Sequence, residues 1–367
     1  MLIGSTRRAW KRISLALKEL SFGQARRRLP STVEIPALEN VTNVSHNRFT
    51  PQRDNLSVRS LFRPKFSTTK DCRFHARDYR GSRDRQYRLF IPSHYNGKKP
   101  LPLVMLLHGC EQTHLDMEKI SNLTTIAERE GFIALYPYIT SYTGMRIRNC
   151  WGWWMPSQTR AGAGEVEDLW QMLEEVREQY QVDDRRIHVA GLSAGAGMAV
   201  ALMVTRCRSI ASGATVAGVA YGESAHAVNF VRQIAPHFRS TRSLVESMEA
   251  QMAEGKSKVP LFIVHSRHDS IVNIRASKNL RDTWASCFGV PLKKVGIRSG
   301  EAGGSHWHHT RYRSQPKRTD IETLWLDGPD HGWYGGRPGQ YSYPKAVDIS
   351  EMIWDFFKNH PKEKEEQ

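Results

Sequence analysis

Seven short, mostly apolar runs alternate with longer amphipathic stretches over the C-terminal three quarters of the chain. Runs with few polar positions are typical of strands buried on both faces, which form parallel sheets covered by helices. The runs are residues 87–91, 103–107, 132–136, 186–190, 214–220, 261–265 and 321–326, and helical spacing marks residues 117–129, 166–180 and 274–284. The pattern predicts one α/β domain over residues 83–367, with a mainly parallel sheet and helices on both faces.

The first 82 residues have a different pattern of apolar and polar residues. Apolar residues recur at helical spacing from Trp10 to Leu20 among lysines and arginines, which predicts a short basic amphipathic helix. Residues 30–82 show little periodicity and many polar positions, as a linker does. We therefore expect a basic N-terminal extension over residues 1–82. It is either a solvated tail or an anchor to an anionic or amphiphilic surface.

Composition and charge narrow the class of protein. A chain with 40% hydrophobic and 25% charged residues has ordinary globular composition, which excludes disordered and collagen-like chains. The 53 Lys and Arg exceed the 37 Asp and Glu, and residues 1–88 hold 20 basic against 7 acidic side chains. Such an excess indicates polyanion binding, surface association or solubility rather than a fold. The basic character therefore belongs mainly to the N-terminal extension.

Cysteine use and the apolar runs bear on the compartment. The five cysteines are an odd number without C-x-x-C spacing, which argues against a disulfide framework and a zinc site and favours a reduced compartment. The start of the chain has no apolar core of the kind found in signal peptides. No apolar run approaches the roughly 20 residues that a membrane-spanning helix needs. We expect a soluble, cytoplasmic protein without a transmembrane segment.

Residues 191–195 read Gly-Leu-Ser-Ala-Gly and carry the most specific local signal in the chain. They follow a strand-like run and precede a helix-like stretch. A strand that turns abruptly into a helix exposes the central serine, while the flanking glycines remove side chains that would collide with nearby backbone. A chance match to this common pattern is the alternative, and the strand and helix on either side weaken it. We predict that Ser193 is a nucleophile.

A nucleophilic serine needs a histidine that acts as a base and a carboxylate that orients the histidine. Where the serine lies on a strand-to-helix turn of this kind, the acid comes next in the chain and the histidine follows it. Asp269 comes just after the run 261–265, and its alternative role is a helix N-cap. His331 lies after the last run, and its alternative is an ordinary loop histidine. Asp327 and Asp330 compete as the acid, although both lie close in sequence to the base.

An ester hydrolase also needs backbone amides that stabilise a tetrahedral oxyanion. One should come from Ala194, the residue after the nucleophile. The other should come from the loop after an early strand, where Cys110 follows His-Gly. An ordinary glycine turn is the alternative at this second position.

These motifs, taken in order, resemble the polyhydroxybutyrate depolymerase family of esterases from about residue 83 to residue 357. The residues that carry the likeness are 103–112, Cys-Trp at 150–151, the turn at 191–195 and His-Gly-Trp-Tyr-Gly-Gly at 331–336. The resemblance implies an α/β-hydrolase fold, with Ser193, Asp269 and His331 as nucleophile, acid and base and with Cys110 and Ala194 as oxyanion donors. It also implies esters as substrates, since the family includes feruloyl and acetylxylan esterases. The chain departs from the family at Gly332 and Tyr334, where Ala and Ser are usual, and neither change removes a catalytic group.

Further side chains near the motif loops have two interpretations each. The aromatic residues Trp153, Trp154, Trp333 and Tyr334 offer flat apolar faces to a polyester, a sugar or an aryl group, or they pack in the core. Cys110 and Cys150 could pair if their loops meet, which a reduced cytoplasm would oppose. The histidines at 306, 308 and 309 fit a surface loop better than a metal site, because no carboxylate or cysteine has matching spacing.

The sequence therefore predicts a serine ester hydrolase that acts through an acyl-enzyme and needs no cofactor or metal. Its expected substrate is a polyhydroxyalkanoate or its oligomers, and the alternatives are feruloyl, acetylxylan and short-chain carboxylic esters. The basic arm could hold the protein at a storage granule or another anionic surface. A non-enzymatic module that binds a surface or nucleic acid on a hydrolase scaffold is the less favoured class. The oligomeric state stays open.

Overall fold

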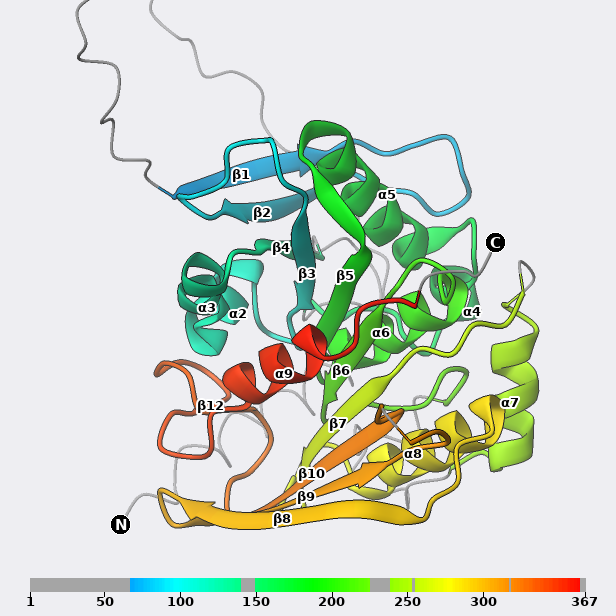
Figure 1. Ribbon diagram of the computed structural model, residues 1–367. Coiled ribbons are helices and arrows are strands. Elements are labelled where there is room, and N and C mark those ends of the chain that lie inside the picture. The colour runs from blue at the N-terminus through cyan, green and yellow to red at the C-terminus, as the bar shows by residue number, and fades with distance from the viewer. Residues whose placement is uncertain (1–66, 140–148, 225–237, 253–254, 317, 364–367) are drawn as a thin grey trace, which may run out of the picture. The chain divides into compact units, whose positions relative to one another are not determined.

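The computed structural model describes residues 67–139, 149–224, 238–252, 255–316 and 318–363 (Figure 1). The predicted amphipathic helix near residues 10–20 lies outside these ranges. None of the helices within the described ranges has the length and apolar character needed to span a bilayer.

A ten-stranded sheet forms the centre of the domain, in the order β1-β2-β4-β3-β5-β6-β7-β10-β9-β8. The six central strands, from β4 to β10, run parallel, and the strands at both edges run antiparallel. The strands are β1 Thr68–Phe74, β2 Arg85–Ile91, β3 Leu101–Leu107, β4 Ile133–Tyr138, β5 Val182–Leu192, β6 Ser212–Val216, β7 Leu261–Ser266, β8 Lys294–Ala302, β9 Ser305–Tyr312 and β10 Ile321–Asp327. A separate pair consists of β11 Trp333–Tyr334 and β12 Ser342–Tyr343.

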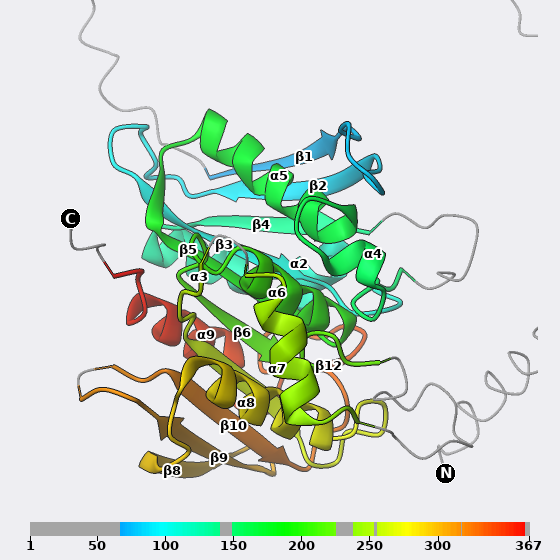
Figure 2. The same ribbon diagram turned by 90° about the vertical axis from the view of Figure 1, so that its right-hand side faces the viewer.

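Helices cover both faces of this sheet, as the apolar pattern predicts. Alternate residues of β3 point to opposite faces, so Leu103 and Met105 join one apolar cluster while Val104 and Leu106 join another. Residues of α5, α6, α7 and α8 pack in the first cluster, and those of α2, α3 and α9 pack in the second (Figures 1 and 2). The helices are α2 His114–Ser121, α3 Leu123–Glu130, α4 Pro156–Thr159, α5 Gly164–Gln179, α6 Ala194–Thr205, α7 Thr241–Glu249, α8 Arg275–Phe288 and α9 Ile349–Lys358.

The domain begins before residue 83, which corrects the predicted boundary. Strand β1 lies in the segment interpreted as a linker, and it pairs antiparallel with β2 along its whole length. Most of its side chains are exposed because it is the edge strand, so it lacks the apolar signal that marks the central strands. The turn between β1 and β2 is also fixed to α5. The buried carboxylate of Asp168 accepts hydrogen bonds from the hydroxyls of Tyr79 (2.6 Å) and Ser82 (2.7 Å) and from Nε of Arg85 (2.6 Å).

Three further elements differ from the sequence prediction. The stretch 117–129 is two helices, because Asn122 between them adopts a left-handed conformation with φ of 54°. Strand β6 ends at Val216 rather than at residue 220, and Ala217 has φ of 53°. The histidines at 306, 308 and 309 lie on β9 of an antiparallel hairpin with β8, not in a loop.

Candidate active site

Ser193 lies on the turn that joins β5 to α6. Its φ of 56° and ψ of −117° fall in a region that residues with side chains rarely adopt. The Ser193 amide donates to the Val216 carbonyl of the next strand at 2.8 Å, which holds the turn against the sheet. The predicted strand, turn and helix are therefore present, and the serine side chain remains partly exposed.

The flanking glycines are required by close contacts. A Cβ atom on Gly191 would lie 2.4 Å from the backbone of Gly195, and one on Gly195 would lie 2.4 Å from the carbonyl oxygens of Leu107 and His108. Side chains at these positions would push β3, the turn and α6 apart. The turn also contacts the loop after β3, because a Cβ atom on Gly109 would lie 3.5 Å from Cβ of Ser193.

Asp269 and His331 are in direct contact, although 62 residues separate them in the chain. Asp269 follows β7 and His331 follows β10, which are parallel neighbours. Nδ1 of His331 lies 2.7 Å from Oδ2 of Asp269. Because an ionised carboxylate only accepts hydrogen bonds, Nδ1 carries the proton, and Nε2 of the neutral ring is left with a lone pair. This imidazole is therefore in the tautomer that a general base requires.

The side chain of Asp269 is completely buried, and its two oxygens have separate partners. Oδ1 accepts the backbone amides of Ile271 (2.9 Å) and Val272 (2.7 Å), and Oδ2 faces His331 and His265. Burial alone would raise the pKa of this carboxyl group, but the hydrogen bonds from His265 and His331 outweigh it and lower the pKa below its ordinary value. Asp269 is thus ionised at neutral pH. It does not cap α8, whose N-cap position is Ile274.

His265 is a second histidine on the same carboxylate, and the sequence analysis did not identify it. Its Nε2 lies 3.1 Å from Oδ2 of Asp269 and 3.0 Å from the Val272 carbonyl, so Nε2 faces two acceptors and carries a proton. Its Nδ1 lies 2.7 Å from the hydroxyl of Ser277 on α8. The ring is fully buried at the end of β7, where it contacts the same Asp269 oxygen as His331 does. The sequence shows only a histidine near the end of a predicted strand, which does not predict a contact with Asp269.

The loop after β3 contains the two predicted features, Gly109 and Cys110. The Gly109 amide donates to Oε1 of the buried Gln112 at 2.9 Å, which fixes the start of the loop. Cys110 forms a disulfide with Cys150, with a Cα–Cα distance of 4.3 Å. The pairing that the sequence left open is therefore present in the structure, and it counts against the mostly reduced compartment that the cysteine count favours. Ala194, the other predicted oxyanion donor, is the first residue of α6.

A third loop closes over these two, and the sequence analysis missed it as well. The ring of Tyr341 lies edge-on to His331 with centroids 6.0 Å apart, and its hydroxyl donates to Glu111 at 2.8 Å. Nε2 of Gln112 donates to the Gln340 carbonyl at 3.1 Å. These contacts connect the loop after β3 with the segment that carries His331. Only the fold could reveal them, because about 230 residues separate the partners.

The aromatic residues that were predicted to contact substrate divide into two groups. Trp333 and Tyr334 are 1% and 0% exposed and lie in the core cluster under α9, where Nε1 of Trp333 donates to Ser350 at 2.9 Å. Core packing is therefore their role, and the prediction of substrate contact is corrected for both. Trp153 is also largely buried and lies against Gly197 of α6. Trp154 packs edge-on to Trp153 and is partly exposed, so it alone keeps a surface that a ligand could reach.

The motif loops all leave the sheet at one edge. Ser193, Asp269 and His331 follow β5, β7 and β10, which are parallel strands within the sequence β5-β6-β7-β10. The structure brings Asp269 and His331 into a hydrogen bond and places the loop of Cys110 against the turn of Ser193. A mainly parallel sheet with a serine on a strand-to-helix turn and a histidine–carboxylate pair on later loops defines an α/β-hydrolase.

Comparison with known proteins identifies the family within this class. The family model described as esterase PHB depolymerase matches residues 85–303, and the chain belongs to that family. This confirms the resemblance that the sequence motifs indicate.

Individual relatives point the same way. Over 267 residues the chain is 33% identical to poly(3-hydroxyalkanoate) depolymerase C of Paucimonas lemoignei, a match that covers 70% of this chain and 63% of the relative. It is 25% identical over 201 residues to feruloyl esterase B of Neurospora crassa, covering 52% of this chain and 67% of that protein. The chain thus spans less than two thirds of the depolymerase it matches. Among solved structures, an acetyl xylan esterase from Aspergillus awamori superposes with a TM-score of 0.60 at 15% identity, covering 79% and 99% of the two chains, which supports the fold.

Proposed function

We propose that this protein is a serine ester hydrolase in which Ser193, His331 and Asp269 act as nucleophile, base and orienting acid. The observation that carries the proposal is the hydrogen bond from Nδ1 of His331 to the buried, ionised Asp269. It keeps the lone pair of the imidazole on Nε2, at the same sheet edge as the strained turn of Ser193.

The proposed reaction follows from these positions. The Ser193 hydroxyl attacks the ester carbonyl while His331 takes its proton and then returns it to the leaving alcohol. The amides of Cys110 and Ala194 donate to the oxyanion that forms, and one such donor is typically worth about 3–4 kcal/mol. Water then hydrolyses the acyl-enzyme, with His331 again acting as the base. Asp269 stays ionised throughout and stabilises the imidazolium.

The catalytic assignment is tested by replacing the nucleophile. Ser193→Ala should lower kcat for p-nitrophenyl butyrate by about four orders of magnitude or more, because the nucleophile is lost while the fold is kept. Ser209→Ala, a change in the turn just after the same helix, is the matched control and should hydrolyse the ester normally. A fluorophosphonate probe should label Ser193 in the wild type and nothing in Ser193→Ala. Hydrolysis by Ser193→Ala at the wild-type rate would refute the assignment.

Polyhydroxyalkanoate or its oligomers is the proposed substrate class, and the family match and the depolymerase relative support it. The feruloyl esterase and acetylxylan esterase relatives support the alternative of smaller or sugar-linked esters. A panel of amorphous polyhydroxybutyrate, methyl ferulate and acetylated xylan ranks these classes by kcat/KM. The Ser193→Ala variant serves as the background for each. A rate above that background on the xylan or ferulate alone would exclude the polyester.

The basic extension is proposed to hold the enzyme at a storage granule or another anionic surface. The support is its composition, since most of the excess positive charge of the chain lies before residue 89. Deleting residues 1–60 should abolish sedimentation with granules and leave hydrolysis of the soluble p-nitrophenyl ester unchanged. Equal sedimentation of both chains would exclude the anchor.

The cellular compartment is a separate proposal from the surface anchor. A disulfide such as Cys110–Cys150 persists in oxidising environments, so it favours a location outside the reducing cytoplasm that the cysteine count suggests. A cytoplasmic location would require both thiols to be reduced in the cell. Alkylating thiols with a mass-tagged maleimide before and after reduction distinguishes the two, because the disulfide protects two of the five cysteines.

A further inference from the structure

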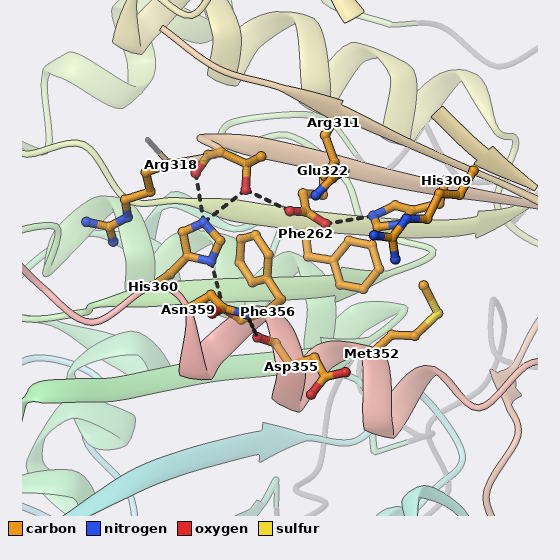
Figure 3. Close-up of a pocket in the computed structure, with 12 residues that line it drawn as sticks. Phe262, His309, Arg311, Arg318, Glu322, Met352, Asp355, Phe356, Asn359 and His360 are labelled. Carbon is orange, nitrogen blue, oxygen red and sulfur yellow. Dashed lines mark hydrogen bonds and ion pairs between the residues drawn. The ribbon is translucent and has the colours of Figure 1, made fainter. Parts of the chain in front are cut away.

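A cavity of about 650 Å³ lies on the face of the sheet that α9 covers, away from the candidate active site (Figure 3). Its strand residues include Phe262 and Glu322 at the starts of β7 and β10, whereas Asp269 and His331 follow the ends of the same two strands. Its other side is the last two turns of α9 and the residues after them. The cavity is therefore separate from the ester hydrolase chemistry.

The floor of the cavity is aromatic. The rings of Phe262 and Phe356 lie 5.6 Å apart, and Phe262 also contacts the ring of His309 at 5.5 Å. The ring of His360 lies tilted against that of Phe356 with centroids 4.0 Å apart, and its Nδ1 and Nε2 lie 2.6 Å from the Phe356 carbonyl and 2.8 Å from the Thr319 carbonyl. These contacts fix the floor of the cavity.

Three arginines line the walls: Arg298 on β8, Arg311 on β9 and Arg318 just before β10. Arg311 lies flat over the edge strand, because a Cβ atom on its neighbour Gly296 would fall 2.8–2.9 Å from Nε and Nη2 of the guanidinium. Glycine at position 296 therefore makes room for this side chain. Arg298 follows two residues later on the same face of β8.

The carboxylates near these arginines already have other partners. Glu322 faces Arg311 across the β9–β10 ladder, yet its Oε2 lies 2.6 Å from Nε2 of His309 and its Oε1 accepts from the hydroxyl of Thr319 at 2.7 Å (Figure 3). Asp355, on the exposed rim, pairs with Lys358 at 3.0 Å. Within the described ranges, Arg298 and Arg311 have no carboxylate within 4 Å.

Arg318 adds donors on the other side of the cavity. It reaches the Pro361 carbonyl at 2.9 Å and the exposed Glu363 at 3.1 Å through its two terminal nitrogens. Its buried Nε has no hydrogen-bond partner among the residues that the structure describes. A buried donor without an acceptor is costly and is usually satisfied by a ligand or a solvent molecule.

We propose that this cavity, which we call the α9 pocket, binds a small molecule that carries a phosphate group. Guanidinium groups present planar pairs of donors that match phosphate oxygens, and two uncommitted arginines supply the charge for a dianion. The aromatic floor suits a flat apolar portion of the same molecule. The proposal is independent of the proposed ester hydrolysis.

Calorimetric titration of the full chain with potassium phosphate and with phenyl phosphate, at constant ionic strength, tests the α9 pocket. Both should bind saturably with one site per chain, and phenyl phosphate should bind more tightly because it reaches the aromatic floor. Arg298→Gln combined with Arg311→Gln should weaken binding by roughly tenfold or more, since both charge-assisted donor sets are lost. Hydrolysis of p-nitrophenyl butyrate should stay at the wild-type rate in this variant.

Lys294→Gln combined with Arg313→Gln is the matched control. Lys294 begins β8 and Arg313 directly follows β9; both are exposed, neither lines the pocket, and the variant loses the same number of positive charges. It should bind phosphate like the wild type. Absence of saturable binding to the wild type would overturn the proposal, and so would an equal loss in the control, which would mean unspecific attraction to a basic surface. Arg298→Gln alone, at an exposed position, keeps the test decisive if the double variant unfolds.

Discussion

The disulfide between Cys110 and Cys150 should stabilise both the fold and the proposed oxyanion loop. It joins residues 40 positions apart. In the chain-entropy model, closing a loop of that length stabilises the folded state by about 4 kcal/mol. Replacing both cysteines by serine should therefore lower the free energy of unfolding by about this amount.

The same change should slow catalysis. Cys110 keeps its backbone amide when serine replaces it, so the variant tests the position of the donor rather than its presence. Trp151, next to Cys150, donates to the His108 carbonyl at 3.1 Å and holds the base of the loop from a second side. We therefore expect a displaced donor rather than a lost one. The expected fall in kcat is about tenfold, less than the 100-fold to 1000-fold that removal of a donor typically costs.

Urea unfolding monitored by fluorescence, with and without a phosphine reductant, measures the first effect. Reduction should lower the midpoint for the wild type and for the control Cys72→Ser, whose free cysteine lies on the edge strand β1. It should leave the doubly substituted variant unchanged. If reduction changes neither the free energy of unfolding nor kcat of the wild type, the bond supports neither the fold nor the loop, and the reasoning fails.

Three other changes test the fold and the site. Asp168→Asn should lower the free energy of unfolding by about 3–5 kcal/mol in urea, because it leaves the buried Arg85 without its carboxylate. Burial lowers the pKa of His188 to about 3 in the folded protein. As the pH falls below about 6.5, His188 therefore binds a proton in the unfolded chain but not in the folded one, which favours unfolding. The fold should thus lose roughly 2–3 kcal/mol between pH 7 and 4.5, and His188→Gln should reduce this loss; an unchanged pH dependence would count against it. His265→Gln should lower kcat about tenfold with little change in KM, because Asp269 loses one of its two histidine partners; a wild-type kcat would show that His331 alone orients it.

The central fold could be predicted because its signals are local. Each central parallel strand is buried on both faces, so its sequence is apolar throughout and stands out from the helices. The nucleophile turn was equally visible, since strand, Gly-x-Ser-x-Gly and helix are adjacent in the chain. The position of Asp269 after β7 and of His331 after β10 followed from the order of motifs, and their contact in the structure agrees with it.

The edges of the sheet could not be predicted in the same way. Strand β1 is exposed on most of its residues, and β8 has only isolated apolar residues among glycine, charged and polar ones, so neither carries an apolar run. The burial of Trp333 and Tyr334 was also hidden, because it depends on α9 packing over them from a distant part of the chain. Side chains that stabilise the site from outside the motifs have no local signature.

The two ends of β7 and β10 show why the sequence alone does not identify such residues. A strand of about six residues is near 20 Å long, so its first and last side chains belong to different surroundings even though they adjoin in sequence. At one end Phe262 and Glu322 line the α9 pocket, and at the other end Asp269 contacts both His265 and His331. His265 belongs to an apolar run by sequence, yet its role is set by Asp269 and Val272 in the loop after β7 and by Ser277 on α8. The chemistry of each end therefore depends on which loops and helices the sheet brings to it, and only the assembled sheet contains that information.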